Sequence, residues 1–572
     1  MTMMRRIVRR PAVATGSDWP DHVPMLLRRL YATRGAADFD AARPKLARLH
    51  APDTLGGMDA ATVLLRDAIV QDKHIVVVGD FDCDGATACA VGVRGLRMLG
   101  AQRVSHAVPN RAVHGYGLSP GLVDDLAALA PDLLVTVDHG IACHAGVAAA
   151  RARGWQVLVT DHHLPGQSLP DAHAIIDPNV RGDGFPSKAL AGVGVMFYVL
   201  LALRARLRAE GLPSDADLTT LLDLVAVGTI ADLVPLDANN RALAGAGLRR
   251  LRAGQGCAGL KALIESSGRD VRTLTAADIG YALAPRINAA GRLEDMALGI
   301  ECLITDDPAQ ARELANVLGE INAERKGVQQ QMTDEAEAAL ARVALDGDMP
   351  PVLCLFDPAW HPGVVGLVAS RMKDRVNRPV VAFAPAEPGS DALRGSARSI
   401  AGLHIRDALA AVDAAMPGLI PRFGGHAMAA GLSLSHGALD AFANALRMHV
   451  ESVLDPALLQ AEVVSDGSLE THEFDRASAE YLRDGGPWGQ AFPEPLFDGV
   501  FDVVGHKVVG LRHLKLSLRL PGRAAPIDAI HFNGWTGTPP PARVHLAYRL
   551  AVDDYRGGDA IQLVVEYCAE PA

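Results

Sequence analysis

The chain has 572 residues, of which 49% are hydrophobic and 21% are charged, as expected for a globular protein of several domains. A formal net charge of −11 argues against a general basic coating for nucleic acid but leaves room for a local basic groove. No run of about 18 apolar residues occurs, so the sequence predicts no membrane span. The seven cysteines are scattered without CxxC spacing, which favours a reducing cytosol over a zinc site or a disulfide framework.

Residues 1–60 are predicted to form a helical extension. In the segment that follows, residues 61–305, three apolar runs end in aspartate: HIVVVGDFDCDG (74–85), DLLVTVDHG (132–140) and WQVLVTDHH (155–163). Runs of β-branched residues and Leu without alternation are typical of strands buried on both faces. With helical patterns between them, they predict a parallel sheet. Ligands of such sheets bind beyond the carboxyl ends of the strands, which here carry Asp80, Asp82, Asp84, Asp138, Asp161, His162 and His163.

So many carboxylates in one place predict divalent cations, because like charges repel and raise one another's pKa. Carboxylates with some imidazole suit Mn²⁺ or Mg²⁺, and a pair of such ions would hold a phosphoryl oxygen and activate water. We expect Asp82 and Asp84 to leave an extended segment on the same side, with Gly85 allowing a turn into the next helix. One aspartate at a strand end is often only a helix cap or turn residue. Three such runs together favour the metal site.

The later segments contain both helical and strand patterns. A helical pattern over 217–236 is followed by a turn that carries Asp232. Residues 306–345 predict one long helix, because their apolar positions recur with 3.6-residue spacing. Residues 346–457 read as a second, smaller α/β unit, and residues 458–572 as short strands and turns.

Four motifs carry a family resemblance. GDFDCDG, VDHG, TDHH and GTIADLVP, in this order, resemble the motifs of the DHH phosphoesterase family. NRAVHGYGLS (110–119), PRINAAGRLED (285–295), WHPGVVGLVASR (360–371), RGSARS (394–399) and FGGHAMAAG (423–431) extend the resemblance, over almost the whole chain, to the bacterial members that degrade single-stranded DNA. The resemblance implies a DHH catalytic domain (61–305), a linking helix (306–345), a DHH-associated domain (346–457) and a C-terminal OB-fold barrel (458–572).

The resemblance also implies two Mn²⁺ or Mg²⁺ ions that share one aspartate. The first would be held by Asp80, Asp82 and Asp138, and the second by Asp84, Asp138, His162 and Asp232. His163 would lie against the scissile phosphate as an acid or electrostatic stabiliser, with Asp161 orienting the ligand imidazole. His139 stands where relatives commonly have Asn, a departure that concerns local hydrogen bonding and not the ligand set.

A phosphodiester substrate needs further cations and donors, and guanidinium forks bind phosphate bidentately. In the matching motifs of the catalytic domain these are Arg111, Tyr116, Arg286, Asn288 and Arg292. In the DHH-associated domain they are Ser396 and Arg398, as a pocket for a terminal 5′-phosphate, and Gly424, Gly425 and His426, whose backbone N–H groups can approach an anion closely. In the barrel they are Lys515 and Arg519, on the outer face of an alternating strand that can track a nucleic-acid backbone. Solvated surface arginines and a tight glycine turn are the alternative interpretations.

The implied activity is a metal-dependent, single-stranded-DNA-specific 5′→3′ exonuclease that releases nucleoside 5′-monophosphates in DNA repair and recombination. The resemblance further implies a cytoplasmic monomer, away from membranes, with a helicase and a single-strand-binding protein as partners. Two alternatives are a DHH phosphodiesterase for short oligonucleotides or cyclic dinucleotides, and a non-catalytic DNA-binding scaffold. Retention of the matching acids and histidines argues against the scaffold.

Overall fold

Five parallel strands make the first sheet. The computed structural model describes residues 5–16, 18–110, 113–343, 349–520, 522–523 and 525–571. The strand order is β3-β2-β4-β5-β6, and every neighbouring pair is parallel. The strands are β2 (Ile75–Val78), β3 (Val104–Ala107), β4 (Leu133–Val137), β5 (Gln156–Thr160) and β6 (Ala174–Ile176). The three apolar runs are therefore the adjacent strands β2, β4 and β5, which confirms the predicted parallel sheet.

Helices cover both faces of this sheet. Val76 and Val78 of β2 belong to one buried cluster with residues of α5 (Pro120–Leu126) and α6 (His144–Ala152). Ile75 and Val77 belong to another with residues of three further helices. These are α3 (Met58–Val70), α4 (Cys83–Met98) and α7 (Gly192–Ala209). Because both faces are covered, the strands are apolar without alternation.

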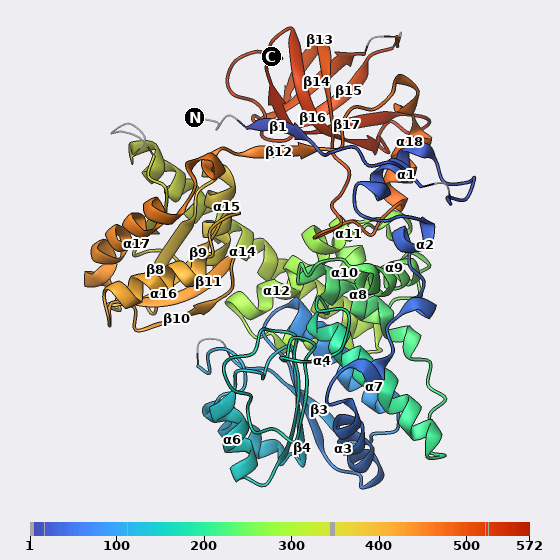
Figure 1. Cartoon of the computed structure of the whole chain (residues 1–572), viewed down its shortest axis with the longest axis vertical. Helices are drawn as coiled ribbons and strands as arrows, with labels where there is room; N and C mark the ends of the chain where they lie inside the picture. Colours follow the sequence, from blue (N-terminus) through green and yellow to red (C-terminus); the bar gives the residue numbers. More distant parts are fainter. Residues whose placement is uncertain are drawn as a thin grey trace.

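A group of helices follows the sheet in the chain. It comprises α8 (Leu222–Ala231), α9 (Ala238–Arg252), α10 (Ala258–Ser266), α11 (Ala276–Asp278), α12 (Ala284–Leu293) and α13 (Ala297–Ile304). A π-helical turn, η6 (Ile279–Leu283), lies between α11 and α12. The helix α14 (Pro308–Val343) then leads to the second α/β unit (Figure 1), which confirms the expected linking helix. Among the described residues, no helix combines the length and apolarity needed to cross a membrane.

The second unit is built on a mixed five-stranded sheet of order β10-β11-β9-β8-β7. Its strands are β7 (Leu353–Phe356), β8 (Val380–Pro385), β9 (Ala392–Arg398), β10 (Arg422–Gly425) and β11 (Ala429–Ser435). The helix α15 (Val365–Val376) shares a buried cluster with α14. The helices α16 (Ile405–Ala415) and α17 (Leu439–Val453) share a second cluster with the sheet. This unit is the smaller α/β domain expected from the sequence.

A closed barrel of order β13-β14-β15-β17-β16 ends the chain. The strands are β13 (Phe497–Val509), β14 (His513–Arg519), β15 (Ile527–His531), β16 (Arg543–Val552) and β17 (Ile561–Ala569). The helix α18 (Arg476–Asp484) packs against β16. Leu514, Leu516 and Leu518 of the alternating strand β14 are buried, as their period of two predicts. The expected C-terminal β-barrel is confirmed.

The first 60 residues are less helical and less separate than expected. Two short helices are present, α1 (Met25–Ala32) and α2 (Phe39–Ala42). However, β1 (Arg6–Arg9) is a strand that pairs in parallel with β12 (Glu462–Ser465) below the barrel (Figure 1). Trp19 and Tyr31 join the buried cluster of the barrel. The helical prediction is wrong for β1, because a four-residue strand is specified by a partner far away in the sequence.

Candidate metal centre

Aspartates and histidines from neighbouring strands gather at the carboxyl edge of the first sheet. Three groups of side chains have ligand atoms that lie within 4.8 Å of one another. The groups are Asp80 with Asp82 and Asp138, Asp84 with His162 and Asp232, and Asp138 with His162 and His163. The structure therefore brings together all the residues expected to bind metal, and His163 lies among them.

Two of the acids that follow β2, Asp82 and Asp84, are held by the start of α4. Asp82 caps this helix, accepting a 3.0 Å hydrogen bond from the backbone N–H of Gly85. Asp84 lies in the first turn of α4, so the prediction that both acids leave an extended segment is wrong for Asp84. Gly85 does not form a turn after the acids either. It lies inside the helix, where a Cβ would come 2.6 Å from the backbone nitrogen of Asp80, so its role is close packing.

The start of α7 fixes two of the carboxylates. Asp84 accepts hydrogen bonds from the backbone N–H groups of Gly192 (2.6 Å) and Val193 (3.0 Å), a favourable place for an anion because helix N-termini carry partial positive charge. Asp138 adopts a left-handed backbone with φ of +63°. A Cβ on Gly192 would come 2.5 Å from Cβ of Asp138. Helix α7 thus approaches the aspartates so closely that its first residue has to be glycine.

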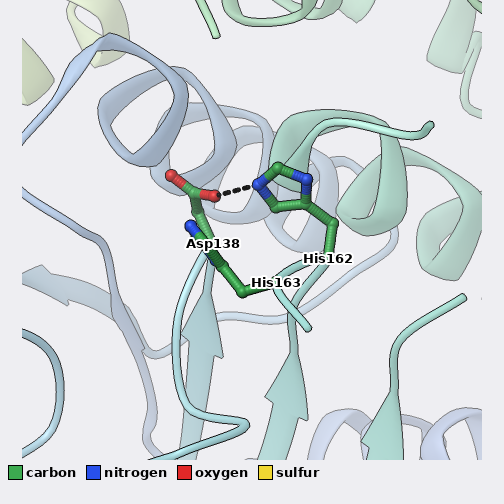
Figure 2. Close-up of side chains that lie close together, drawn as sticks. All are labelled: Asp138, His162 and His163. Carbon is green, nitrogen blue, oxygen red and sulfur yellow. Dashed lines mark ion pairs between the residues drawn. The ribbon is translucent and has the colours of Figure 1, made fainter. Parts of the chain in front are cut away.

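Asp138 and His162 face each other across the ends of β4 and β5 (Figure 2). Nε2 of His162 lies 3.1 Å from Oδ1 of Asp138 and 3.5 Å from Oδ2 of Asp232. Apart from this close contact, neither Nε2 of His162, Oδ1 of Asp138 nor Oδ1 of Asp80 makes a hydrogen bond within the described residues, although all three atoms are buried. Buried polar atoms are normally paired, so these three fit the coordination of a cation.

The pKa values of the clustered side chains also indicate a cation site. Burial, and after it repulsion from neighbouring carboxylates, raises the pKa of Asp80, Asp138 and Asp232 well above the ordinary range. The same causes raise the pKa of Asp84 to about 7. Burial lowers the pKa of His162 to about 4, so its imidazole is neutral, as a metal ligand must be. Divalent cations would relieve the repulsion, and the hard oxygen donors with one imidazole suit Mn²⁺ or Mg²⁺.

Asp161 positions His163 rather than the imidazole of His162. Oδ1 of Asp161 accepts a 2.8 Å hydrogen bond from Nδ1 of His163 and 2.7 Å and 3.1 Å bonds from the backbone N–H groups of His162 and His163. The ring of His162 bonds instead to the backbone carbonyl of Leu190. The expectation that Asp161 orients the ligand imidazole is therefore wrong. Burial would lower the pKa of His163, but the bond to Asp161 and the nearby carboxylates raise it to about 9.

The second α/β unit reaches into this centre. The ring of His426 stacks on that of His163 with 5.9 Å between centroids. Nη1 of Arg292 donates to the carbonyl of Gly363 at 3.3 Å, joining α12 to the segment before α15. Tyr116 of the first unit also contacts His163, edge-on to its ring at 6.1 Å. Side chains of both units thus meet at the metal centre.

The other residues expected to bind substrate lie in several places. Asn288 accepts a 2.7 Å hydrogen bond from the backbone N–H of Cys83 and so supports the start of α4. Arg286 donates to the carbonyls of Ala282 and Ser266. Arg111 lies outside the described residues.

Ser396 and Arg398 are neighbours on one face of β9. Nη1 of Arg398 donates to Oγ of Ser396 at 2.8 Å. A Cβ on Gly366, in the first turn of α15, would lie 2.9 Å from Nη2 of Arg398 and 3.0 Å from Oγ of Ser396. A guanidinium, a hydroxyl and a helix N-terminus therefore meet at one point, which is a favourable setting for an anion.

The remaining expected contacts differ in character. Gly424 and Gly425 end β10, and Gly425 has a φ of +142°, so the turn into β11 itself requires glycine. On the barrel, Lys515 pairs with Asp528 at 3.3 Å, whereas Arg519 is exposed. Of these two cations, Lys515 is thus neutralised from the next strand, β15.

Sequence reasoning missed the groups that hold the ligands. These are the backbone amides that open α7, the Leu190 carbonyl, and Asn179, whose Nδ2 donates to the His162 carbonyl at 2.6 Å. Backbone groups carry no residue-type signal. The two glycines one residue apart in AGVGV (191–195) were the one clue to a close approach.

Comparisons with known proteins match the two α/β units and the barrel. Family models match residues 74–229 (DHH family, N-terminal domain), 350–452 (DHHA1 domain) and 465–567 (RecJ OB domain). The single-stranded-DNA-specific exonuclease RecJ of Salmonella typhimurium is 48% identical over 575 residues, which cover 99% of each chain.

Two crystal structures of RecJ from Thermus thermophilus are also similar. The complex with Mn²⁺ has a TM-score of 0.81 at 31% identity and covers 100% of this chain and 80% of that one. The complex with Mg²⁺ has a TM-score of 0.75 at 30% identity, with coverage of 99% and 79%. Given the identity along almost the full length and the matching order of domains, the chain belongs to the RecJ family of DHH proteins.

Proposed function

We propose that the protein is a 5′→3′ exonuclease specific for single-stranded DNA, which hydrolyses phosphodiester bonds with two divalent ions and releases nucleoside 5′-monophosphates. Its role would lie in DNA repair and recombination. The observation that carries the proposal is the gathering of carboxylate and imidazole ligand atoms at the sheet edge, within 4.8 Å of one another, together with the RecJ relatives that act on single-stranded DNA.

The ligand sets proposed for the two ions share Asp138. One consists of Asp80, Asp82 and Asp138, and the other of Asp84, Asp138, His162 and Asp232. Mn²⁺ or Mg²⁺ bound there supplies Lewis acidity to the phosphate and lowers the pKa of a bound water. The protein's own part is to hold these ligands in place before substrate arrives, through the cap of α4 and the N-terminus of α7.

His163 is proposed to contact the scissile phosphate. Its imidazole is a cation with a pKa of about 9, so at neutral pH it donates a hydrogen bond to a phosphoryl oxygen and stabilises the negative charge of the transition state. Asp161 fixes the ring through Nδ1, which leaves Nε2 for the substrate. Tyr116 and His426 flank the ring and restrict the space around it.

Ser396 and Arg398 are proposed to hold the terminal 5′-phosphate, with the N-terminus of α15 behind them. A pocket for an end group explains why such an enzyme would begin at a 5′ end. Contacts from Arg111, Arg286, Asn288 and Arg292 along the strand, from the Gly424–His426 turn and from Lys515 and Arg519 on the barrel belong to the same proposal. So do the domain boundaries at residues 60, 305, 345 and 457.

The setting in the cell is also a proposal. We infer a monomer in the cytoplasm that works with a helicase and a single-strand-binding protein. The seven free cysteines support a reducing compartment.

The test is a product assay with Mn²⁺ on single strands and duplexes that carry a label at either end. Release of labelled mononucleotides from the 5′ end of single strands, and not of blunt duplexes, is the expected result. A preference for dinucleotides over long strands would favour the phosphodiesterase alternative. Binding of DNA without any cleavage would favour the scaffold.

The pocket for the end group has its own readout. Arg398→Ala should reduce the preference for a 5′-phosphate over a 5′-hydroxyl, with Arg447→Ala, on the exposed side of α17, as the control. An unchanged preference would remove the pocket from the proposal.

A further inference from the structure

A π-helical turn exposes an aromatic side chain that no part of the proposed mechanism uses. Tyr281 lies in η6, between α11 and α12, and is 82% exposed. A π-helical turn is rare and is frequent at functional sites. Here it presents a large flat ring to solvent.

Three cations from different elements surround this turn. Arg269 follows α10, Arg286 lies in the first turn of α12, and Lys326 is exposed on α14. Arg286 donates to the carbonyl of Ala282, the residue next to Tyr281. We call Tyr281, Arg269, Arg286 and Lys326 the Tyr281 patch.

A fourth cation, Arg325, is buried behind the patch. It is 7% exposed, and its guanidinium donates only to the side-chain amide oxygens of Asn322 and Gln329, on its own helix. Among the described residues, these four cations make one ion pair, between Arg269 and Asp278 at 3.3 Å.

The positive charges are close enough to repel. Burial, and then the charges of Arg286, Arg325 and Arg269, lower the pKa of Lys326. Burial and the charge of Arg269 lower the pKa of Arg286, whose Nε is buried without a hydrogen-bond partner. A buried cation without an acid destabilises the fold. A polyanion bound at this surface would offset that cost.

The patch is connected to the metal centre and faces the barrel. The same helix that carries Arg286 contacts the first turn of α4 through Asn288. The helix α11 lies on the side of the catalytic domain that is nearest to the barrel (Figure 1). Burial raises the pKa of Glu494 in the segment that enters the barrel, Arg549 lowers it, and the charges of Glu566 and of Asp278, at the end of α11, raise it further. The elements of the patch therefore contact the metal centre through α12 and approach the barrel through α11.

We infer that the Tyr281 patch binds the single strand on the 3′ side of the scissile linkage, with one base stacked on Tyr281 and the phosphates beside Lys326 and Arg269. This inference rests on the proposed function and names a binding site of that enzyme. An exposed ring among cations matches unpaired nucleic acid, because every base has a face that can stack and every linkage carries a charge. An acidic protein segment would use the cations but would gain little from the ring.

The first experiment tests stacking. A 5′-phosphorylated oligothymidylate with one abasic position, moved along the strand, is titrated against the protein in EDTA so that no cleavage occurs. The wild type should lose affinity by about tenfold at one position. Tyr281→Ala should bind the intact strand about as weakly as the wild type binds the strand with that abasic position. Its affinity should no longer depend on where the abasic position lies, whereas that of Tyr281→Phe should. A position dependence that is the same in Tyr281→Ala would overturn the inference.

The second experiment tests the cations. Lys326→Ala should lower the slope of log affinity against log salt by about 0.7, the value for one phosphate of a single strand, and Lys326→Arg should restore it. Lys73→Ala is the matched control. Lys73 precedes β2, at the edge of the first sheet opposite the metal centre, and its Nζ donates to Gln156 at 3.2 Å. Equal slopes for Lys326→Ala and the wild type would exclude Lys326 from the strand's path.

Cleavage separates this inference from the proposed function. With Mn²⁺, Tyr281→Ala and Lys326→Ala should lose more kcat/KM on a long strand than on a 5′-phosphorylated dinucleotide, which is too short to reach the patch. Equal losses on both substrates would mean that the variants damage the centre itself and would refute a separate site. If the wild type neither binds nor cleaves single strands, the proposed function fails and the inference fails with it.

Discussion

Replacing Asp138 by asparagine separates metal binding from folding. Asn has the same shape as Asp and tolerates a left-handed backbone, so the φ of +63° at this position is retained. Ala would add a backbone penalty of about 1 kcal/mol there. Asp138→Asn should therefore remove one negative charge from both proposed ligand sets and leave the packing against Gly192 unchanged.

The expected magnitudes follow from the geometry. The ligand oxygens of neighbouring carboxylates lie within 4.8 Å of one another, and at that limiting distance two ionised carboxylates repel by about 3.5 kcal/mol at an effective dielectric constant of about 20. Because the raised pKa values already leave part of the cluster protonated, we expect Asp138→Asn to stabilise the metal-free protein by about 1–3 kcal/mol. Wild type with free Mn²⁺ at about 100 times its Kd should gain about 2.7 kcal/mol, and the variant should lose most of that gain.

The assay is calorimetric unfolding in EDTA and in Mn²⁺. The variant should unfold at a higher temperature than wild type in EDTA, show little response to Mn²⁺ and cleave no DNA. Asp223→Asn is the control, since Asp223 is fully buried and accepts from the backbone N–H groups of Leu224 and Cys257, outside the ligand sets. It should keep the full Mn²⁺ response. A variant Asp138→Asn that is less stable in EDTA yet responds normally to Mn²⁺ would refute the reasoning.

Three further substitutions test the supports of the site and the fold. Gly192→Ala should displace the start of α7 from Asp138, which should cost about 1–3 kcal/mol of stability and most of the activity. Gly194→Ala is the control, because its added Cβ meets only a flexible leucine 3.1 Å away. It should lower both the stability and the cleavage rate less. Asp161→Asn should lower kcat about 10- to 100-fold without changing the Mn²⁺ titration. Burial would raise the pKa of Asp498, but hydrogen bonds from an arginine of β1, a serine and a histidine hold it below the ordinary value. Its stabilising effect is therefore complete above about pH 4 and lost as the pH falls further, and denaturant titrations of Asp498→Asn should lack this acid-dependent loss.

The parallel sheet and its acids could be predicted because their signals are local. Four consecutive buried residues in β2 and five in β4 leave a continuous apolar run, and the chain must turn polar where each strand ends. Strand order in a parallel sheet then places Asp80, Asp138 and His162 at one edge. That edge follows from the sequence without knowledge of any long-range contact.

The supports of the site could not be predicted in this way. The partners of Asp84 are backbone amides at the start of α7, 108 and 109 residues away, and any residue type supplies an amide. Asp161 has the same limitation, since three of its four hydrogen bonds come from backbone N–H groups and only the fourth from an imidazole. A motif names the side chain but does not say which of two adjacent histidines it serves.

The N-terminal strand and the Tyr281 patch show a second cause of failure. β1 is defined by its pairing with β12, and the patch by cations on three elements that are well separated in the chain. Each of those cations, taken alone, is better explained as a solvated surface residue. The cations become one group, with one acid among them, when α12 and α14 pack together. A bound anion would offset the repulsion within a group that carries such an excess of positive charge. The same reasoning applies to the metal centre with the signs reversed: the aspartates repel one another until cations arrive. The protein therefore carries two opposite charge imbalances that a phosphodiester strand, together with its metal ions, would satisfy at the same time.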